Sequence, residues 1–343
     1  MLQRRSFHTV VILKFIILFD AIEFNREVLM KQVVIYFPGQ GAQQLGMLAD
    51  LAIQYPIVKE TFEQASQAIN QDLWSLVQNG PAEELNLTYN TQPILVTASA
   101  AIWRIIQQEV GADIDVVASA GHSVGEYSAL YAAGVLSLQD AVRLVKKRGE
   151  LMDTAVPAGE GGMAAILGLD REKIEQVCAD ASSAGVVEPA NFNAPGQIVI
   201  AGTAAGIAQA CIVAKEAGAK RALPLQVSGP FHSSLMRQAA EPFLAALESV
   251  EWSEPQFDVY HNANNAVSSI ADMKQRLVEQ LYSPVNWIGA VEASCHGAEL
   301  AIEVGPGKVI TGLNKRINKE LITFSTGDSA SFEKLLNEIK GES

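Results

Sequence analysis

The sequence predicts an α/β protein that combines a mostly parallel sheet with a smaller inserted unit. Three observations favour this class. Strand-like apolar runs alternate with helix-like stretches, a glycine-bearing turn joins one strand directly to a helix, and residues 160–227 follow a β-α-β-β-α-β order. The chain has 343 residues, 49% of them hydrophobic and 18% charged, which is long enough for about two domains.

The first predicted strand covers residues 33–37 and ends in the turn Pro-Gly-Gln-Gly. Apolar residues at helical spacing predict helices over 94–109 and 138–153, and a second strand covers 116–121 between them. Such alternation is typical of a parallel sheet that is covered by helices on both faces.

Shorter elements follow from about residue 160. We expect strands at 163–169, 186–192, 197–203 and 219–227, and helices at 171–185 and 204–218. This order is that of a ferredoxin-like domain, which we place at 160–227. Residues 30–159 and 228–343 then form the large α/β domain, because strand-like segments resume at 257–263 and 300–307.

Residues 1–29 differ from the rest of the chain. They combine a basic start with an apolar stretch, residues 10–19, that is too short to cross a bilayer. Asp20 and Glu23 stand where an export signal would have a small-residue cleavage site. Because Met30 opens a strand-like segment, it is a second candidate for the start of the working chain, which would make residues 1–29 an extension; the sequence leaves this choice open.

Charge and cysteine content exclude several classes of protein. The formal net charge of -13 argues against a nucleic-acid binder, because Lys and Arg are nowhere dense enough to neutralise a run of phosphates. Cys178, Cys211 and Cys295 are widely spaced and odd in number, which argues against a disulfide framework or a metal site. We therefore expect a cytoplasmic protein without a metal and without a membrane segment.

The strongest local signal is the serine of G-H-S-V-G, residues 121–125. It follows a predicted strand and precedes a helix-like stretch. This is the arrangement of a nucleophile elbow in α/β-hydrolase-like folds, where a sharp turn lifts the hydroxyl out of the sheet. A helix cap packed between two glycines is the structural alternative for Ser123.

A serine nucleophile needs a base, and His232 is the best candidate among five histidines. It lies in the Gly- and Pro-bearing loop S-G-P-F-H-S-S, from which a side chain can reach a cleft. An ordinary loop histidine is the alternative. We expect His122 to point away from the serine hydroxyl, and we see no convergent polar neighbours for His261 or His296.

Seven motifs occur in order along the chain. They are F-P-G-Q-G-A-Q (37–43), G-H-S-V-G-E-Y-S-A-L (121–130), V-K-K-R-G-E-L-M (145–152), N-F-N-A-P-G-Q-I-V-I-A-G (191–202), G-P-F-H-S-S-L-M (229–236), Q-L-Y-S-P-V-N-W (280–287) and E-V-G-P-G-K-V-I (303–310). With these motifs the chain closely resembles the malonyl-CoA:acyl carrier protein transacylases, the acyltransferases of fatty-acid and polyketide biosynthesis. The resemblance runs from about residue 30 to beyond residue 320.

The resemblance implies a role for each matching catalytic residue. Ser123 would be the acylated nucleophile and His232 its general base, with the ring oriented by the main-chain carbonyl of Gln280. The backbone N–H groups of Gln40 and Val124 would form the oxyanion hole, since glycines around Gln40 let the backbone approach the developing charge.

The resemblance also implies the substrate. Arg148 would clamp the free carboxylate of a malonyl group through parallel hydrogen bonds. Without the resemblance, it would be interpreted as a solvated helix residue beside Lys146 and Lys147. Phe231 is bulky and favours malonyl over methylmalonyl, and Met152 would line the same pocket, although it could equally be a core residue.

The expected partners are malonyl-CoA and an acyl carrier protein, whose phosphopantetheine thiol receives the malonyl group in a ping-pong reaction. No cofactor and no metal is implied, and the resemblance suggests a monomer. Because carrier proteins are acidic and this chain is also acidic, docking needs a local basic patch, for which Lys308, Lys315 and Arg316 are candidates.

Three alternatives stay open at this point. An acyl-carrier-protein acyl hydrolase on the same scaffold would share the serine and histidine, but gains nothing from Arg148 if its acyl chains are neutral. An unrelated α/β-hydrolase needs an acidic residue between serine and histidine on a loop after a strand. A docking module without chemistry would not need intact site residues. The motifs do not separate fatty-acid from polyketide biosynthesis.

Overall fold

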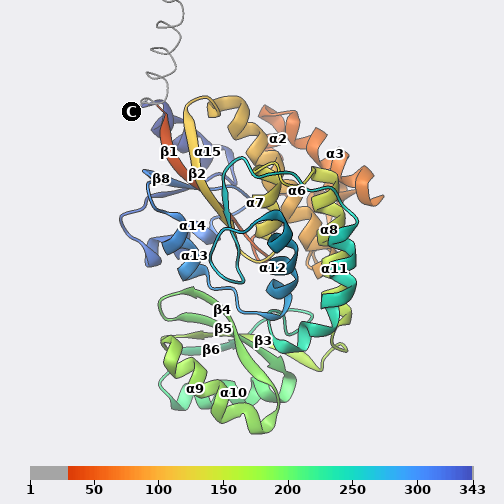
Figure 1. Ribbon diagram of the computed structural model, residues 1–343, viewed down its shortest axis with the longest axis vertical. Helices are drawn as coiled ribbons and strands as arrows, with labels where there is room; N and C mark the ends of the chain where they lie inside the picture. Colours follow the sequence, from red (N-terminus) through yellow and green to blue (C-terminus); the bar gives the residue numbers. More distant parts are fainter. Residues whose placement is uncertain (1–29, 342–343) are drawn as a thin grey trace, which may run out of the picture.

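Two β-sheets organise residues 30–341, the part of the chain that the computed structural model describes (Figure 1). One sheet is parallel throughout, with the order β7-β2-β1-β8-β9, and the other is antiparallel, with the order β4-β5-β3-β6. The strands are β1 (Lys31–Phe37), β2 (Ile114–Gly121), β3 (Gly161–Leu167), β4 (Val187–Ala194), β5 (Gln197–Thr203), β6 (Arg221–Pro224), β7 (Asp258–Tyr260), β8 (Leu300–Glu303) and β9 (Thr323–Ser325). The predicted extension, residues 1–29, lies outside the described residues.

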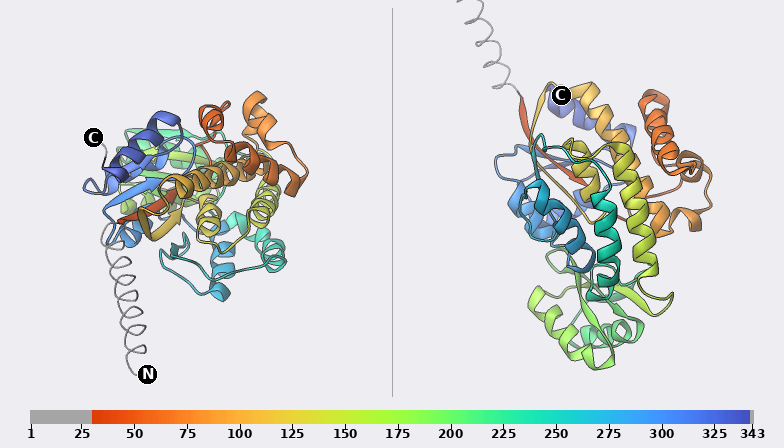
Figure 2. Two further views of the ribbon diagram at one scale, coloured as in Figure 1. Left: turned by 90° about the horizontal axis from the view of Figure 1, so that it is seen from above. Right: turned by 45° about the vertical axis from the view of Figure 1, so that its right-hand side comes forward.

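Helices cover both sheets. They are α2 (Ala49–Gln54), α3 (Ile57–Ile69), α4 (Leu73–Asn79), α5 (Ala82–Leu85), α6 (Thr88–Val110), α7 (Gly125–Ala132), α8 (Leu138–Thr154), α9 (Arg171–Ala181), η1 (Ser182–Ala184), α10 (Ala204–Glu216), η2 (Ser234–Ala239), α11 (Ala240–Glu248), α12 (Ile270–Tyr282), α13 (Trp287–Ser294), α14 (Val309–Ile317) and α15 (Ser329–Lys340). In the right-hand view of Figure 2, α8 and α11 run together toward the four-stranded sheet.

The central strand β1 shows why the parallel sheet needs helices on both faces. Its alternate residues Val33 and Ile35 belong to the core formed with α6, α7 and α8. Val34 and Tyr36 belong to a second core on the opposite face, together with Trp287 of α13. All four side chains are fully buried, as expected of a strand covered on both faces. The predicted parallel sheet is therefore confirmed.

The four-stranded sheet has a core of its own, in which Ile166 and Ile200 pack against Ile174 of α9 and Ile207 of α10. The chain order β3-α9-β4-β5-α10-β6 agrees with the predicted order. Strand β6 is shorter than expected, since it covers Arg221–Pro224 within the predicted range 219–227. The predicted domain boundaries fall in the connections before β3 and after β6, and the division into domains stays a prediction.

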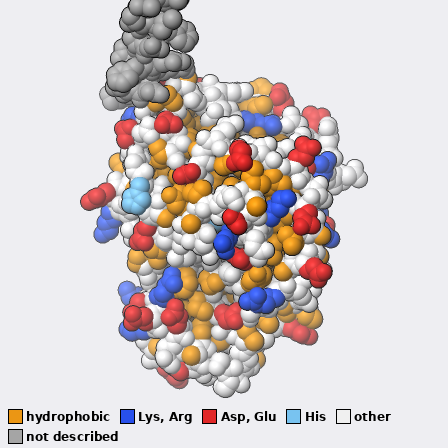
Figure 3. Space-filling model, in the orientation of Figure 1, with side chains coloured by type: hydrophobic (Ala, Val, Ile, Leu, Met, Phe, Trp, Pro, Cys, Tyr) orange, Lys and Arg blue, Asp and Glu red, His pale blue; other side chains and the backbone are white. Residues whose placement is uncertain are grey.

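Helix α6 begins at Thr88, whereas the apolar spacing predicted a start at residue 94. Its first turns carry buried polar residues, Gln92 among them, and therefore show no apolar period. Pro93 is accommodated in the second turn. No helix among residues 30–341 is both long and apolar enough to cross a membrane. On the face shown in Figure 3, acidic and basic side chains are interspersed.

Candidate active site

Ser123 occupies a tight turn between β2 and α7. Its φ of 53° lies in the left-handed region, which costs free energy for a residue with a side chain. The neighbouring glycines allow this turn, since a Cβ on Gly121 would lie 1.9 Å from the main-chain carbon of Gly125. Asn262 holds the turn from both sides: it accepts from the Ser123 N–H at 2.8 Å and donates to the Gly121 carbonyl at 2.7 Å.

His232 lies beside the serine and uses both ring nitrogens. Its Nε2 is 2.7 Å from Ser123 Oγ, and its Nδ1 is 2.8 Å from the main-chain oxygen of Gln280 in α12. A carbonyl oxygen can only accept a hydrogen bond, so Nδ1 carries the proton and the Nε2 lone pair faces the hydroxyl. The His232 N–H also donates to the Leu281 carbonyl, which ties the loop to α12.

The environment of His232 keeps its ring neutral. Burial, and after it the positive charge of Arg148, lower the pKa of His232 to about 3. The residue is 4% exposed. A neutral imidazole at physiological pH is the state that a general base requires.

Arg148 brings a guanidinium to the same hydroxyl. It extends from α8, is 1% exposed, and donates from Nη2 to Ser123 Oγ at 3.2 Å and from Nη1 to Gln92 Oε1 at 2.9 Å. Among the described residues, its Nε has no hydrogen-bond partner and no carboxylate forms an ion pair with it. Because Arg148 is buried, the alternative interpretation from sequence, a solvated position on the helix surface, is wrong. A buried cation without a contacting anion favours an anionic ligand.

Gln40 and Val124 line the cavity at Ser123 from two different turns. Within residues 30–341, neither main-chain N–H has a hydrogen-bond acceptor. Gly39 permits the close approach of the two turns, because a Cβ there would lie 2.5 Å from the His122 carbonyl oxygen. Two free amides beside a serine hydroxyl have the arrangement that stabilises an oxyanion in acyl transfer.

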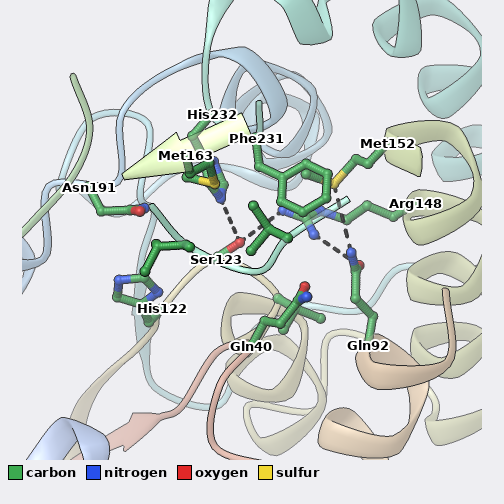
Figure 4. A pocket seen from close by; sticks show the side chains of 13 residues that line it. Gln40, Gln92, His122, Ser123, Arg148, Met152, Met163, Asn191, Phe231 and His232 are labelled. Atoms are coloured by element: carbon green, nitrogen blue, oxygen red, sulfur yellow. Dashed lines mark hydrogen bonds between the residues drawn. The ribbon is translucent and has the colours of Figure 1, made fainter. Parts of the chain in front are cut away.

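A cavity of about 110 Å³ opens above Ser123 (Figure 4). The turns that follow β1 and β2 of the parallel sheet contribute Gln40 and Ser123 to its walls, and the antiparallel sheet contributes Met163 of β3 and Asn191 of β4. The lining residues are Gln40, Gln92, His122, Ser123, Val124, Arg148, Met152, Met163, Asn191, Leu225, Val227, Phe231 and His232. The site therefore lies between the parallel sheet and the antiparallel sheet.

Every predicted site residue except Gln280 lines this cavity. Gln280 lies behind it, where its main-chain oxygen accepts from His232 and its side-chain Oε1 accepts from Arg148 Nη2 at 2.7 Å. Sequence reasoning missed Gln92 and Asn191. The available signal for Gln92 was its place directly before Pro93, in a stretch without apolar periodicity. Asn191 stands in the quoted motif N-F-N-A-P-G.

Two histidines other than His232 also have defined partners. His122 points away from the serine hydroxyl as expected, and its Nε2 is 2.8 Å from Asn193 Oδ1. The expectation that His261 lacks polar neighbours was wrong. The His261 ring is fully buried and its Nδ1 lies 2.7 Å from Glu126 Oε1, because the chain after β7 folds back under α7.

Comparisons with known proteins agree on one family. A family model described as "Acyl transferase domain" matches residues 34–311. The malonyl CoA-acyl carrier protein transacylase of Haemophilus influenzae is 52% identical over 305 residues, covering 88% of this chain and 97% of the relative. That of Escherichia coli strain K12 is 51% identical over 290 residues, covering 84% and 93%.

Solved structures give the same result. The acyl carrier protein S-malonyltransferase from Vibrio cholerae matches with a TM-score of 0.85 and 50% identity, covering 89% of this chain and 99% of that one. A malonyl-transacylase in complex with a type II PKS acyl-carrier protein matches with a TM-score of 0.86 and 47% identity, covering 90% and 99%.

Proposed function

This chain belongs to the acyl transferase domain family, and on that premise we propose that it forms a malonyl ester on Ser123. The protein is an acyltransferase that moves a malonyl group from malonyl-CoA to an acyl carrier protein. The observation that carries the ester proposal is the buried Arg148 guanidinium, 3.2 Å from a serine hydroxyl that also faces a neutral histidine.

In the first half-reaction, His232 Nε2 takes the proton of Ser123 Oγ as the oxygen attacks the thioester carbonyl of malonyl-CoA. The oxyanion of the tetrahedral intermediate lies between the N–H groups of Gln40 and Val124. When the C–S bond breaks, the CoA sulfur takes the proton back from His232 and leaves as a thiol. A malonyl ester stays on Ser123.

The second half-reaction repeats these steps with another thiol. His232 removes the proton from the phosphopantetheine thiol of the carrier protein, and the sulfur attacks the ester carbonyl. The C–O bond breaks, Ser123 Oγ regains the proton from His232, and malonyl leaves on the carrier. Because each thiol uses the site in turn, the kinetics are ping-pong.

The acyl group is selected at its far end. Arg148 can bind the free carboxylate of malonyl through parallel hydrogen bonds, which acetyl cannot accept. Phe231 and Met152, both nearly fully buried, line the cavity beside Arg148, and we expect their bulk to leave little space for an extra methyl group. These contacts support malonyl over methylmalonyl.

We infer an α/β-hydrolase-like large domain and a ferredoxin-like domain at 160–227, and the strand order β4-β5-β3-β6 supports the second assignment.

Lys308, Lys315 and Arg316 stay candidates for docking the carrier, although Arg316 already donates to the Pro195 carbonyl. Cytoplasmic location, a monomeric state and independence from cofactors stay predictions, the first supported by three free cysteines.

An acyl-carrier-protein hydrolase on the same scaffold is not favoured. The relatives that match nearly the whole chain are named transacylases, and a hydrolase of neutral acyl chains gains nothing from a buried cation. The two functions differ in the fate of the acyl group, which reaches a thiol in one and water in the other.

The test is transfer of labelled malonyl from malonyl-CoA to a purified holo carrier protein by wild-type enzyme, S123A and S128A. Ser128 is a buried serine on α7, the helix that follows Ser123, and it lies outside the cavity, so S128A controls for folding. We expect malonyl-carrier from wild type and S128A, parallel lines in initial-rate plots, and no product from S123A. Free malonate in place of malonyl-carrier would support the hydrolase instead.

A further inference from the structure

A buried carboxylate lies directly beneath the serine turn and contacts none of the reacting groups. Glu126, in the first turn of α7, is fully buried. Its Oε2 accepts from Gln280 Nε2 at 2.6 Å and from the Asn262 N–H at 3.0 Å, and its Oε1 faces His261 Nδ1 at 2.7 Å. We propose that Glu126 is a positioning residue that holds Gln280 in place for malonyl binding, an inference that rests on the proposed function.

Gln280 is the residue through which Glu126 would act, because it contacts all three groups of the proposed chemistry. Its main-chain oxygen accepts from His232 Nδ1, and its side-chain Oε1 accepts from Arg148 Nη2. Its Nε2 donates to the Ser123 carbonyl at 3.0 Å as well as to Glu126. A displaced Gln280 side chain would therefore move the guanidinium first.

The orientation of the Gln280 amide is fixed by the chemistry of its neighbours. An ionised carboxylate can only accept hydrogen bonds, and a guanidinium can only donate them. The amide nitrogen must therefore face Glu126 and the amide oxygen must face Arg148. Both bonds involve a charged partner, and such bonds are shorter and stronger than bonds between neutral groups.

The same arrangement balances charge without blocking the clamp. Glu126 is a buried negative charge one amide group away from the buried positive charge of Arg148. In direct contact, the carboxylate would occupy the guanidinium donors that a malonyl carboxylate needs. With Gln280 between them, the charges partly compensate each other while Arg148 Nε keeps no partner among the described residues.

His261 fixes the other end of the carboxylate. Its Nδ1 lies against Glu126 Oε1, and its Nε2 has no partner within the described part of the chain. A ring that donates from Nδ1 leaves only a lone pair at Nε2 without a partner. The carboxylate is therefore held by three donors, which restricts its rotation and the position of Gln280 with it.

The test is single-turnover loading of malonyl onto wild-type enzyme, E126Q and E126D, followed by quenched-flow mass spectrometry. E126Q keeps the shape but removes the charge, whereas E126D keeps the charge but shortens the reach. We expect both to raise the half-saturating malonyl-CoA concentration by about tenfold, because a charge-assisted bond is weakened or lost, with a smaller change in the limiting rate constant. Rate constants do not depend on the folded fraction, which affects only the amplitude.

Repeating the measurement in the variant Q280L tests whether Glu126 acts through the side-chain amide of Gln280. Q280L removes the side-chain amide and keeps the main-chain carbonyl, so E126Q should raise the half-saturating concentration no further in Q280L. E303Q is the matched control, since Glu303 is an equally buried carboxylate that accepts from Ile310 and Thr311 outside the cavity. It should change the amplitude or the melting temperature only.

Three outcomes overturn the inference: an unchanged or lowered half-saturating concentration in E126Q, an effect of E126Q that is equally large in Q280L, or the same effect in E303Q. Failure of the wild type to load malonyl would overturn the proposed function itself. The two failures are therefore distinguishable in one experiment.

Discussion

His232 combines a strained backbone, a buried ring and a neighbouring cation. Its φ is 61°, and burial together with Arg148 lowers its pKa to about 3. A base must be neutral to accept a proton, and a ring with this pKa stays neutral far below the ordinary value of about 6.5. The residue is thus ready to accept the serine proton at any physiological pH.

The rate constant of malonyl loading should consequently be flat from about pH 8 down to about pH 5, because His232 does not titrate in this range. The measurement is the loading rate constant at low malonyl-CoA across that range in buffers of constant ionic strength. An acid limb with a midpoint near 6.5 would mean that the histidine has an ordinary pKa and that this description of its environment is wrong.

Phe231 should limit the size of the acyl group. Replacing it with alanine opens space beside Met152, and we expect F231A to load methylmalonyl-CoA with a relative preference raised by about 10-fold or more, as one methyl group is worth about 1 to 3 kcal/mol. The measurement is the ratio of loading rate constants for methylmalonyl-CoA and malonyl-CoA. A ratio unchanged from wild type would place the selection elsewhere in the cavity.

Single residues differed in how far the sequence could identify them. Ser123, His232 and Arg148 belong to motifs that occur in order along the chain, and the sequence predicted each of them as a site residue. Glu126 and Gln92 were not predicted, although Glu126 stands within a quoted motif. Their contacts come from helices far apart in sequence, and a buried polar residue is recognisable only when its partners are in place.

Helices α6 and α8 approach closely enough to set the position of Arg148. Gly149 follows Arg148 on α8, and a Cβ there would lie 2.6 Å from Cα of Tyr89 on α6. Arg148 Nη1 reaches Gln92 on the same helix α6. The distance between the two helices therefore decides where the guanidinium lies relative to Ser123.

G149A should push the two helices apart, destabilise the protein by about 1 to 3 kcal/mol through overpacking, and raise the half-saturating malonyl-CoA concentration. G312A is its matched control, because Gly312 lies inside helix α14 with no atom within 4 Å of an added Cβ. It should stabilise the protein by about 0.5 to 1 kcal/mol. Urea unfolding and single-turnover loading measure both effects, and equal results for the two variants would contradict the packing argument.

At the level of elements, apolar periodicity predicted type and order well and predicted boundaries poorly. Strand β5 matches its predicted range, 197–203, because Gly196 forms a turn before it and Thr203 caps helix α10 directly after it. Helix α6 starts six residues before its predicted start at 94, since its first turns are buried but polar. Strand β7 has three residues where seven were expected, because the chain turns away at His261 to bond Glu126.

The whole molecule places the site where segments of the two sheets meet. Ser123 lies in the turn that follows β2 of the parallel sheet, while Met163 and Asn191 come from the antiparallel sheet. The sequence predicted both sheets and their order along the chain. It could not predict how they face each other, because that depends on contacts such as the pairing of Phe192 with Val285, which no local pattern indicates.

Burying a neutral histidine makes the stability of the molecule depend on pH. Between about 3 and about 6.5 the unfolded chain binds a proton at His232 that the folded chain does not, so stability is full above about pH 6.5 and falls as pH is lowered. The loss approaches about 1.4 kcal/mol per pH unit within this window. The measurement is the free energy of unfolding in urea, for wild type and H232Q, at about pH 7.5 and about pH 5.5. The change with pH in wild type minus that in H232Q isolates the contribution of His232, because the other titratable groups contribute equally to both proteins. Identical pH dependence of the two proteins would show that His232 is not buried in its neutral form.

The measurement that tests the central claim most directly is the intact mass of wild type, S123A and R148A after brief exposure to malonyl-CoA or acetyl-CoA. We predict the added mass of one malonyl group on wild type, mapped to the peptide that contains Ser123. We predict no addition to S123A, and strongly reduced malonyl loading of R148A without a matching loss for acetyl. Malonyl on S123A, or acetyl loading of wild type as complete as malonyl loading, would contradict the account.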